Sequence, residues 1–420
     1  MRNDPSLTDL IDMDAIAAEL ARPRAHRRRC GRVASADGAT ISVAGLATEA
    51  RLGDRIAIGP TVEEARIGGE IVALDEKRAQ AMTLGPADGV AVGDRVWLTP
   101  DRGLHPCEGW IGRVIDAFGE PLDGRSLPTG AVEAPLRRPP PPAVMRGGLG
   151  HRLSTGVGAL DTVLPLARGQ RIGIFAGSGV GKSRLLADLS RNVEADVVVF
   201  ALIGERGREL SEFMTEGLGP EGMSRAVMVV STSDESALTR RRAAWTAMTV
   251  AEHFRDSGKH VLLIVDSLTR FAEAHREIAL TAGETPSLRA YPPSTASMIA
   301  GLAERAGPAG RRAEDGAITA IFSVLVAGSD MEEPVADITR GVLDGHVILD
   351  RSIAERGRFP AIDVARSVSR CLPKAASEKE NALITETRRL LRAYETAAPR
   401  VQTGLHQPGA DTELDRAIAL

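Results

Sequence analysis

A glycine-rich loop that could bind phosphate lies between an apolar run and a helical pattern. Residues 172–175 (IGIF) are followed by AGSGVGKS (176–183) and then by RLLADLSRNV. Gly177, Gly179 and Gly181 allow the backbone to curl so that successive N–H groups point at phosphate oxygens. The N-terminus of the following helix adds partial positive charge. Because a P-loop requires this order of strand, loop and helix, the sequence predicts a nucleotide phosphate site.

The last two residues of this loop supply a charge and a metal ligand. Lys182 is expected to neutralise the β- and γ-phosphates, and the Ser183 hydroxyl is expected to bind Mg²⁺. Lys182 is one of five lysines among 52 basic residues, which is consistent with a need for a compact ammonium group here. The loop begins with Ala176 where the standard pattern has glycine, and alanine fits there if its φ is negative. The predicted nucleotide-binding residues of the loop are Ala176, Gly177, Ser178, Gly179, Val180, Gly181, Lys182 and Ser183.

Two carboxylates each follow an apolar run. VLLIVD places Asp266 at the carboxyl end of a buried strand, where ligands collect in open α/β sheets, and Asp266 is expected to join the Mg²⁺ shell. In FALIGERGREL, Glu205 could polarise an attacking water as general base, provided that its strand neighbours the P-loop strand. Glu209 is the rival base, although it lies one turn into a helix and is expected to pair with Arg206 or a neighbour. Phosphate loop and carboxylates together predict Mg²⁺-dependent nucleotide hydrolysis.

A buried sheet must position these groups. Apolar runs alternate with helix-length segments over much of the chain. The runs are residues 172–175, 197–203, 226–230, 261–265 and 317–326. Because strands that are apolar throughout are typical of a mostly parallel sheet covered on both faces, we predict an α/β core over residues 101–370.

The segments on either side of this core have other patterns. Residues 30–100 contain short alternating stretches with Gly and Asp turns, which predicts a small antiparallel β-barrel. Its one large aromatic residue after Gly31 is Trp97, whereas a base-stacking barrel needs several. Residues 371–420 carry a helical pattern and predict a C-terminal α-helical domain. Residues 1–29 predict a short amphipathic helix and a basic connector, which would suit binding of a partner.

Composition argues against several classes of protein. A net charge of −4 and a pI near 6.1 do not suit a protein that coats nucleic acid. No stretch of about 18 uncharged apolar residues is present, so no membrane span is predicted, and the N-terminus does not resemble a secretion signal. Cys30, Cys107 and Cys371 lack metal-ligand spacing, which favours reduced thiols in a cytoplasmic protein.

As a set, the motifs resemble those of the type III secretion ATPases. They are AGSGVGKS, ALIGERGRE, LIVDSLTRFA, YPPS, DGAITAIFSVLV, EEPVADITRGVLDGHVILDR and RFPAIDVARSVSR. The flagellar protein-export ATPases are the most similar group, and the catalytic subunit of the rotary ATP synthase is a distant relative. The resemblance spans residues 30–418. It implies an α/β fold in which a RecA-like P-loop core follows a small N-terminal β-barrel and precedes a C-terminal α-helical domain.

The resemblance implies the same roles for the P-loop residues and for both carboxylates as the motifs themselves do. It also implies two further site residues. Arg370, in SVSR, aligns with the arginine finger that reaches into a neighbouring subunit's site. Phe359, in RFPAID, aligns with an aromatic residue that stacks on adenine. Because Glu205 and Arg370 occur on one chain, a ring of identical subunits, a homohexamer by resemblance, could be catalytic at every interface.

The function implied is ATP hydrolysis with Mg²⁺ that drives type III protein export, chiefly of flagellar components. The implied partners are further copies of the chain, export substrates and chaperones, a membrane export gate and a stator-like regulatory protein bound by the N-terminal segment. No nucleic acid is among them, and the expected location is the cytoplasm at the inner face of the cell membrane. The chain ends at DTELDRAIAL, where relatives continue, so we expect an abbreviated helical domain.

Three alternatives stay open. An injectisome ATPase shares the same motifs. An RNA-translocating ring helicase shares the barrel and the RecA core, but it would use aromatic residues that this barrel lacks. A non-hydrolysing ring subunit is the third, and Lys182, Glu205 and Asp266 together argue against it.

Overall fold

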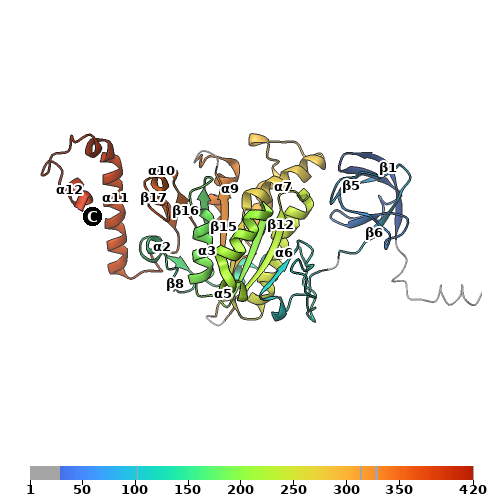
Figure 1. The fold of residues 1–420 in the computed structure, drawn as a ribbon, viewed down its shortest axis with the longest axis horizontal. Coiled ribbons are helices and arrows are strands. Elements are labelled where there is room, and N and C mark those ends of the chain that lie inside the picture. Colours follow the sequence, from blue (N-terminus) through green and yellow to red (C-terminus); the bar gives the residue numbers. More distant parts are fainter. Residues whose placement is uncertain (1–28, 102, 313–314, 327–329, 420) are drawn as a thin grey trace, which may run out of the picture. The chain divides into compact units, whose positions relative to one another are not determined.

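The computed structural model describes residues 29–419 apart from 102, 313–314 and 327–329 (Figure 1). The chain divides into two compact units, Met1–Asp101 and Arg102–Leu420. The amphipathic helix expected near the N-terminus lies outside the described residues. Among the helices that are described, none is both long and apolar enough to span a bilayer.

The first unit is a closed antiparallel barrel with the strand order β1-β2-β5-β4-β3-β6. Alternate residues point into its interior, as Ile41 and Val43 of β2 show, and both are fully buried. The predicted barrel is therefore confirmed. Its strands are β1 (Cys30–Asp37), β2 (Thr40–Ala44), β3 (Arg55–Ile58), β4 (Ile67–Leu74), β5 (Arg78–Thr83) and β6 (Arg95–Thr99).

The second unit is built on a nine-stranded sheet with the main order β17-β16-β10-β15-β13-β11-β12-β7, and β14 pairs with β15. All five predicted apolar runs are strands of this sheet (β10, β11, β12, β13 and β15), and neighbours among them are parallel. Only β17 and β14 run antiparallel to their partners. The strands are β7 (Arg113–Ile115), β10 (Arg171–Ala176), β11 (Val197–Glu205), β12 (Ala226–Thr232), β13 (His260–Asp266), β14 (Gly307–Pro308), β15 (Ala317–Leu325), β16 (Gly345–Leu349) and β17 (Ile362–Ser369), and β8 (Arg152–Leu153) and β9 (Leu166–Ala167) form a separate pair.

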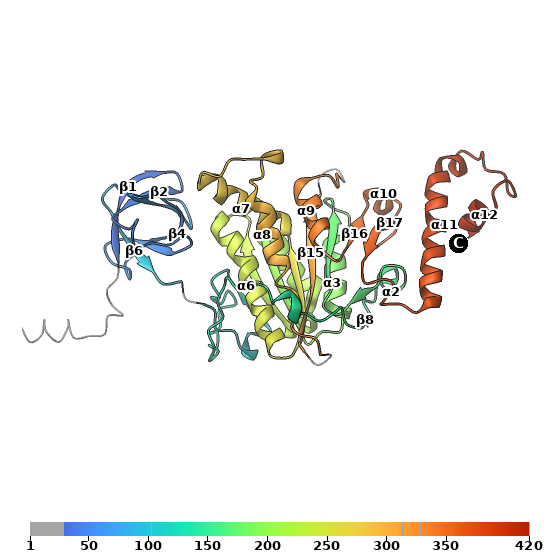
Figure 2. The ribbon, with the colours of Figure 1, turned by 180° about the vertical axis from the view of Figure 1, so that it is seen from behind.

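Both faces of this sheet are buried. On β11, Val199 and Ala201 belong to one hydrophobic cluster, and Val198 and Phe200 belong to another. Helices α6, α7 and α8 cover the first face (Figure 2), and α3 and α5 cover the second (Figure 1). Burial on both faces explains why these strands are apolar throughout rather than alternating. The helices of this part are α2 (Gly158–Thr162), α3 (Lys182–Asn192), α4 (Gly207–Glu212), the π-helix η5 (Phe213–Leu218), α5 (Gly219–Ser224), α6 (Ala237–Asp256), α7 (Leu268–Thr281), α8 (Ser294–Ala303), α9 (Pro334–Val342) and α10 (Arg351–Glu355), with 3-10 turns η3 (Glu108–Trp110), η4 (Ala143–Met145) and η6 (Leu288–Ala290).

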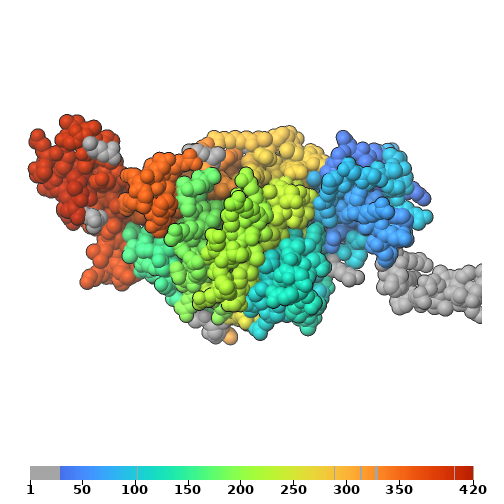
Figure 3. Space-filling model, viewed as in Figure 1, coloured from blue at the N-terminus to red at the C-terminus, as the bar shows by residue number. Residues whose placement is uncertain are grey.

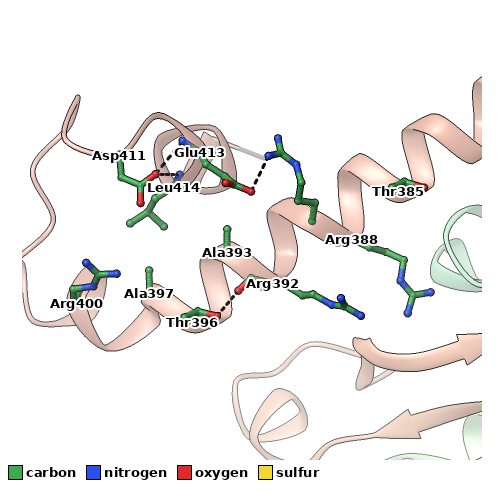
Figure 4. A pocket seen from close by; sticks show the side chains of 11 residues that line it. Thr385, Arg388, Arg392, Ala393, Thr396, Ala397, Arg400, Asp411, Glu413 and Leu414 are labelled. Atoms are coloured by element: carbon green, nitrogen blue, oxygen red, sulfur yellow. Dashed lines mark hydrogen bonds and ion pairs between the residues drawn. The ribbon is translucent and has the colours of Figure 1, made fainter.

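The expected C-terminal helices are α11 (Glu378–Gln402) and α12 (Thr412–Ala419), which form a lobe beside β17 (Figure 3). A capping box starts α11, because the Ser377 hydroxyl accepts from the Glu380 N–H and the Glu380 carboxylate accepts from the Ser377 N–H. A cavity of about 670 Å³ lies along α11 and α12, and Arg389 pairs with Glu413 across the two helices at 3.0 Å (Figure 4). Around this cavity, Arg388 and Arg392 point away from α12 in Figure 4.

Candidate functional site

The predicted phosphate loop joins the end of β10 to the start of α3. β10 lies between β15 and β16 and ends at Ala176, which does not have a positive φ. The chain then turns through Gly179 (φ 77°) and Gly181 (φ 89°), in the region that strains residues with a side chain. The loop therefore has the conformation that curls N–H groups inward at the head of a helix. This is the arrangement that binds phosphate in P-loop proteins.

Both carboxylates lie at the same edge of the sheet as this loop, because the strands that carry them run parallel to β10. Asp266 ends β13 and Glu205 ends β11. The role of Glu205 was expected to require that its strand neighbours the P-loop strand. This expected adjacency is wrong, since β15 and β13 lie between β11 and β10. Glu205 nevertheless reaches the loop, and its Oε1 lies 3.8 Å from Lys182 Nζ. Lys182 lies at the start of α3 rather than on β10, and its Nζ contacts both Asp266 and Glu205.

Lys182 and Asp266 lie at the centre of a cluster of polar side chains that also includes Glu205 and Ser323. Lys182 Nζ donates to Asp266 Oδ1, and the two side chains are only 11% and 6% exposed. The same Oδ1 accepts a hydrogen bond from Ser323 Oγ at 2.5 Å. Ser323 is fully buried on β15, and the sequence analysis missed it, because only the strand order reveals that β15 separates β10 from β13.

The surroundings of Glu205 raise the pKa of its carboxyl group. Burial and the nearby negative charge of Asp266 raise its pKa to about 7, against the opposing effect of Lys182. Glu209 contributes to this rise in pKa, and its carboxylate lies 3.5 Å from Arg206, the pairing expected from the sequence. A carboxylate with a pKa near 7 can accept a proton at neutral pH and release it again, which suits a general base.

A cavity of about 570 Å³ opens beside these groups, a size common for small-molecule sites. Ser183, Glu205 and Asp266 line it, so hydroxyl and carboxylate oxygens face the same space. Among the described residues, no group of three or more His, Cys, Asp or Glu side chains could hold a metal ion alone. Mg²⁺ typically binds one or two protein oxygens together with phosphate oxygens and waters, and these donors fit that pattern.

Phe359 also lies at the loop. Phe359 is 59% exposed, and its Cδ1 lies 3.4 Å from the position that a Cβ atom would take on Gly181. A second contact, which the sequence analysis missed, is made by Arg351 at the start of α10, whose Nη2 donates to the Ser178 carbonyl at 3.2 Å. The exposed aromatic face beside the loop is available for stacking on a base.

Arg370 does not join this cluster. It follows β17, whose Ser369 pairs with Gly345 at the amino end of β16, while the P-loop end of β10 is level with Leu349. Arg370 is exposed, its N–H donates to the Asp344 carbonyl, and it lies at the opposite edge of the sheet, about 13 Å along the strand direction. It therefore cannot act on a nucleotide bound at its own P-loop.

Comparison with known proteins places the chain in a family. Residues 156–369 match the ATP synthase alpha/beta family, nucleotide-binding domain. The chain is 47% identical to the flagellum-specific ATP synthase of Caulobacter vibrioides (93% of this chain, 89% of the relative). It is 45% identical to the SPI-2 type 3 secretion system ATPase of Salmonella typhimurium (87% and 83%). The assembled ATPase EscN of the enteropathogenic E. coli type III secretion system superposes with a TM-score of 0.86 at 37% identity (93% and 92%).

These matches confirm the family resemblance, the RecA-like fold class and the prediction of an enzyme that acts on ATP. The chain belongs to the ATP synthase alpha/beta family, and within that family it is an ATPase of the flagellar and type III secretion group.

Proposed function

We propose that this chain hydrolyses ATP with Mg²⁺ in a homohexameric ring and that the ring drives type III protein export in flagellar assembly. The observation that carries the proposal is the ionic cluster in which Lys182 contacts both Asp266 and Glu205 at the end of the P-loop. The two carboxylates of this cluster line one cavity, while Arg370 lies at the far edge of the sheet. Flagellum-specific ATP synthases at 40–47% identity support the flagellar assignment.

In this proposal the loop N–H groups and Lys182 bind the phosphates, and Phe359 stacks on adenine. Ser183 and Asp266 would hold Mg²⁺, which when bound neutralises charge on the phosphates. Glu205 orients the attacking water and accepts its proton, since its pKa lies near neutrality. Arg370 of a neighbouring subunit stabilises the negative charge that develops on the transferred phosphate.

The position of Arg370 supports a ring, because this residue could meet a nucleotide only across an interface between subunits. EscN has been solved as an assembled ATPase and in complex with its central stalk EscO. By analogy we propose a stalk-like partner for this chain. A stator-like protein bound by residues 1–29, export substrates, chaperones and a membrane export gate complete the proposed partners. The site of action would be the cytoplasmic face of the membrane.

Hydrolysis is expected to depend steeply on protein concentration, because the site is incomplete in an isolated subunit. Specific activity should rise as the chain assembles and should fall to a small fraction of that value on dilution to monomers. ATPase rate and mass distribution, measured on the same dilution series by light scattering or ultracentrifugation, test this. A monomeric sample that hydrolyses ATP as fast per subunit as the assembled one would contradict the ring.

The pH profile should follow Glu205. Since a general base works only when deprotonated, and burial raises the pKa of Glu205 to about 7, kcat/KM is expected to rise with pH and level off above about pH 8. Because Glu209 contributes to that raised pKa, Glu209→Gln should move the midpoint to lower pH. Steady-state rates from about pH 5.5 to 8.5 provide the measurement, and a flat profile in the wild type would argue against Glu205 as base.

The second candidate is an injectisome ATPase. It is favoured by the 45% identity to the SPI-2 enzyme, close to the 47% found with a flagellar relative. Affinity capture with residues 1–25 as bait, followed by identification of the partner, separates the two. A flagellar partner would support the first assignment, and an injectisome partner would support the second.

A further inference from the structure

We propose that Ser323 is a positioning residue that fixes the Asp266 carboxylate for its role toward the metal. This inference rests on the proposed function, because it concerns how the Mg²⁺-ATP site is held in shape. Ser323 would not touch nucleotide or metal, and it would act only through Asp266.

Strand register brings the two residues together. β15 lies between the P-loop strand β10 and β13, the strand that ends in Asp266. Phe322 of β15 pairs with Val265 of β13, so the next residues along, Ser323 and Asp266, lie side by side. Ser323 Oγ donates to Asp266 Oδ1 at 2.5 Å, and Ser323 has no measurable exposure. A buried hydroxyl without a partner is costly, so a serine in this apolar strand requires the acceptor that Asp266 provides.

The hydrogen bonds around Asp266 are asymmetric. Oδ1 accepts from both Lys182 and Ser323, while none of the hydrogen bonds recorded among the described residues uses Oδ2. The two donors therefore fix the carboxylate so that one oxygen is occupied by protein and the other is available. Outer-shell donors of this kind orient ligating carboxylates in metal sites.

Nucleotide binding would remove one of these two donors. Lys182 is expected to turn toward the β- and γ-phosphates, which compete with Asp266 for its ammonium group. Ser323 cannot follow, because it is buried within the sheet. Its hydroxyl would then be the donor that keeps Asp266 in place while the metal is bound.

The test is binding of a fluorescent ATP analogue to the full chain, measured over a Mg²⁺ titration and again in EDTA. Loss of an outer-shell partner typically weakens metal affinity by about 10–100-fold. Ser323→Ala is therefore expected to raise the Mg²⁺ concentration at half-saturation by about tenfold or more. Binding in EDTA should stay close to that of the wild type, because the loop and Lys182 are intact. Ser323→Thr, which restores the hydroxyl, should recover most of the Mg²⁺ dependence.

Thr319→Ala is the matched control. Thr319 is another fully buried hydroxyl on β15, but it bonds to Gly169 N–H and His260 at the far edge of the sheet. It should lower thermal stability without changing the Mg²⁺ half-saturation. If Ser323→Ala fails to fold, the nearly isosteric Ser323→Cys, a weak donor, carries the same expectation.

Two results would overturn the inference, and neither is confused with failure of the proposed function. An unchanged Mg²⁺ half-saturation in the folded variant would show that Ser323 does not position Asp266. Equal weakening of binding with Mg²⁺ and in EDTA would show a general structural role. If nucleotide binding and hydrolysis by the wild-type chain did not depend on Mg²⁺, that result would instead contradict the proposed function itself.

Discussion

Replacing Glu205 by glutamine is expected to lower the rate of ATP hydrolysis by about 10²–10⁴-fold, the usual contribution of a general base. Glutamine keeps the size of the side chain but cannot accept a proton from water. Nucleotide affinity should stay the same or rise, since Lys182 loses a competing carboxylate 3.8 Å away and a negative charge near the phosphates disappears. Single-turnover hydrolysis and fluorescent-nucleotide binding, both measured at pH 8, separate the two effects.

Glu209→Gln is the matched control for this prediction. Glu209 lines the same cavity, but its carboxylate is half exposed and pairs with Arg206. At pH 8 its variant should hydrolyse ATP within a few-fold of the wild type. The assignment fails if Glu209→Gln is the variant that loses activity and Glu205→Gln remains active.

Arg370→Ala is expected to have the second large effect, a loss of about 10³-fold or more in hydrolysis, by comparison with arginine fingers in GTPases. Arg370 is exposed, and within the described part of the chain its guanidinium makes a single long hydrogen bond of 3.5 Å, to the Arg340 carbonyl. The variant should therefore fold and bind nucleotide normally. The measurement is the ATPase rate of an assembled sample, with Arg366→Ala as control. Arg366 is an arginine within β17, close to Arg370 in the chain, and it pairs with Asp350 and Asp363. Equal losses in both variants would point to damage of β17 rather than to a missing finger.

Local patterns were sufficient to predict the parts of the site that lie within one strand–loop–helix segment. The P-loop is readable because its glycines need positive φ and its flanking strand and helix are contiguous with it. Asp266 is readable because it ends an apolar run. The barrel and the parallel core could be predicted for the same reason, since alternation and continuous apolar runs reflect burial on one face or on both.

The contacts that depend on strand order could not be predicted. Nothing in the sequence indicates that β15 lies between β10 and β13, so the Ser323 bond to Asp266 was missed. For the same reason the expectation that β11 neighbours β10 was wrong, although Lys182 Nζ still lies 3.8 Å from Glu205 Oε1. Arg351 was missed because α10 meets the P-loop only after β16 has joined the sheet beside β10. Such pairings connect residues far apart in the chain, and local propensity carries no information about them.

The claim on which the account depends is that one subunit holds the nucleotide and the water while its neighbour supplies Arg370. Mixing equal amounts of the Glu205→Gln and Arg370→Ala chains tests it most directly, because each variant alone is expected to lose almost all of its activity. In mixed rings about a quarter of the interfaces would combine an intact Glu205 with an intact Arg370 from the neighbour. We therefore expect the mixture to recover a substantial part of that fraction of the wild-type rate. A mixture that assembles into rings yet stays as inactive as its two components would contradict the shared site.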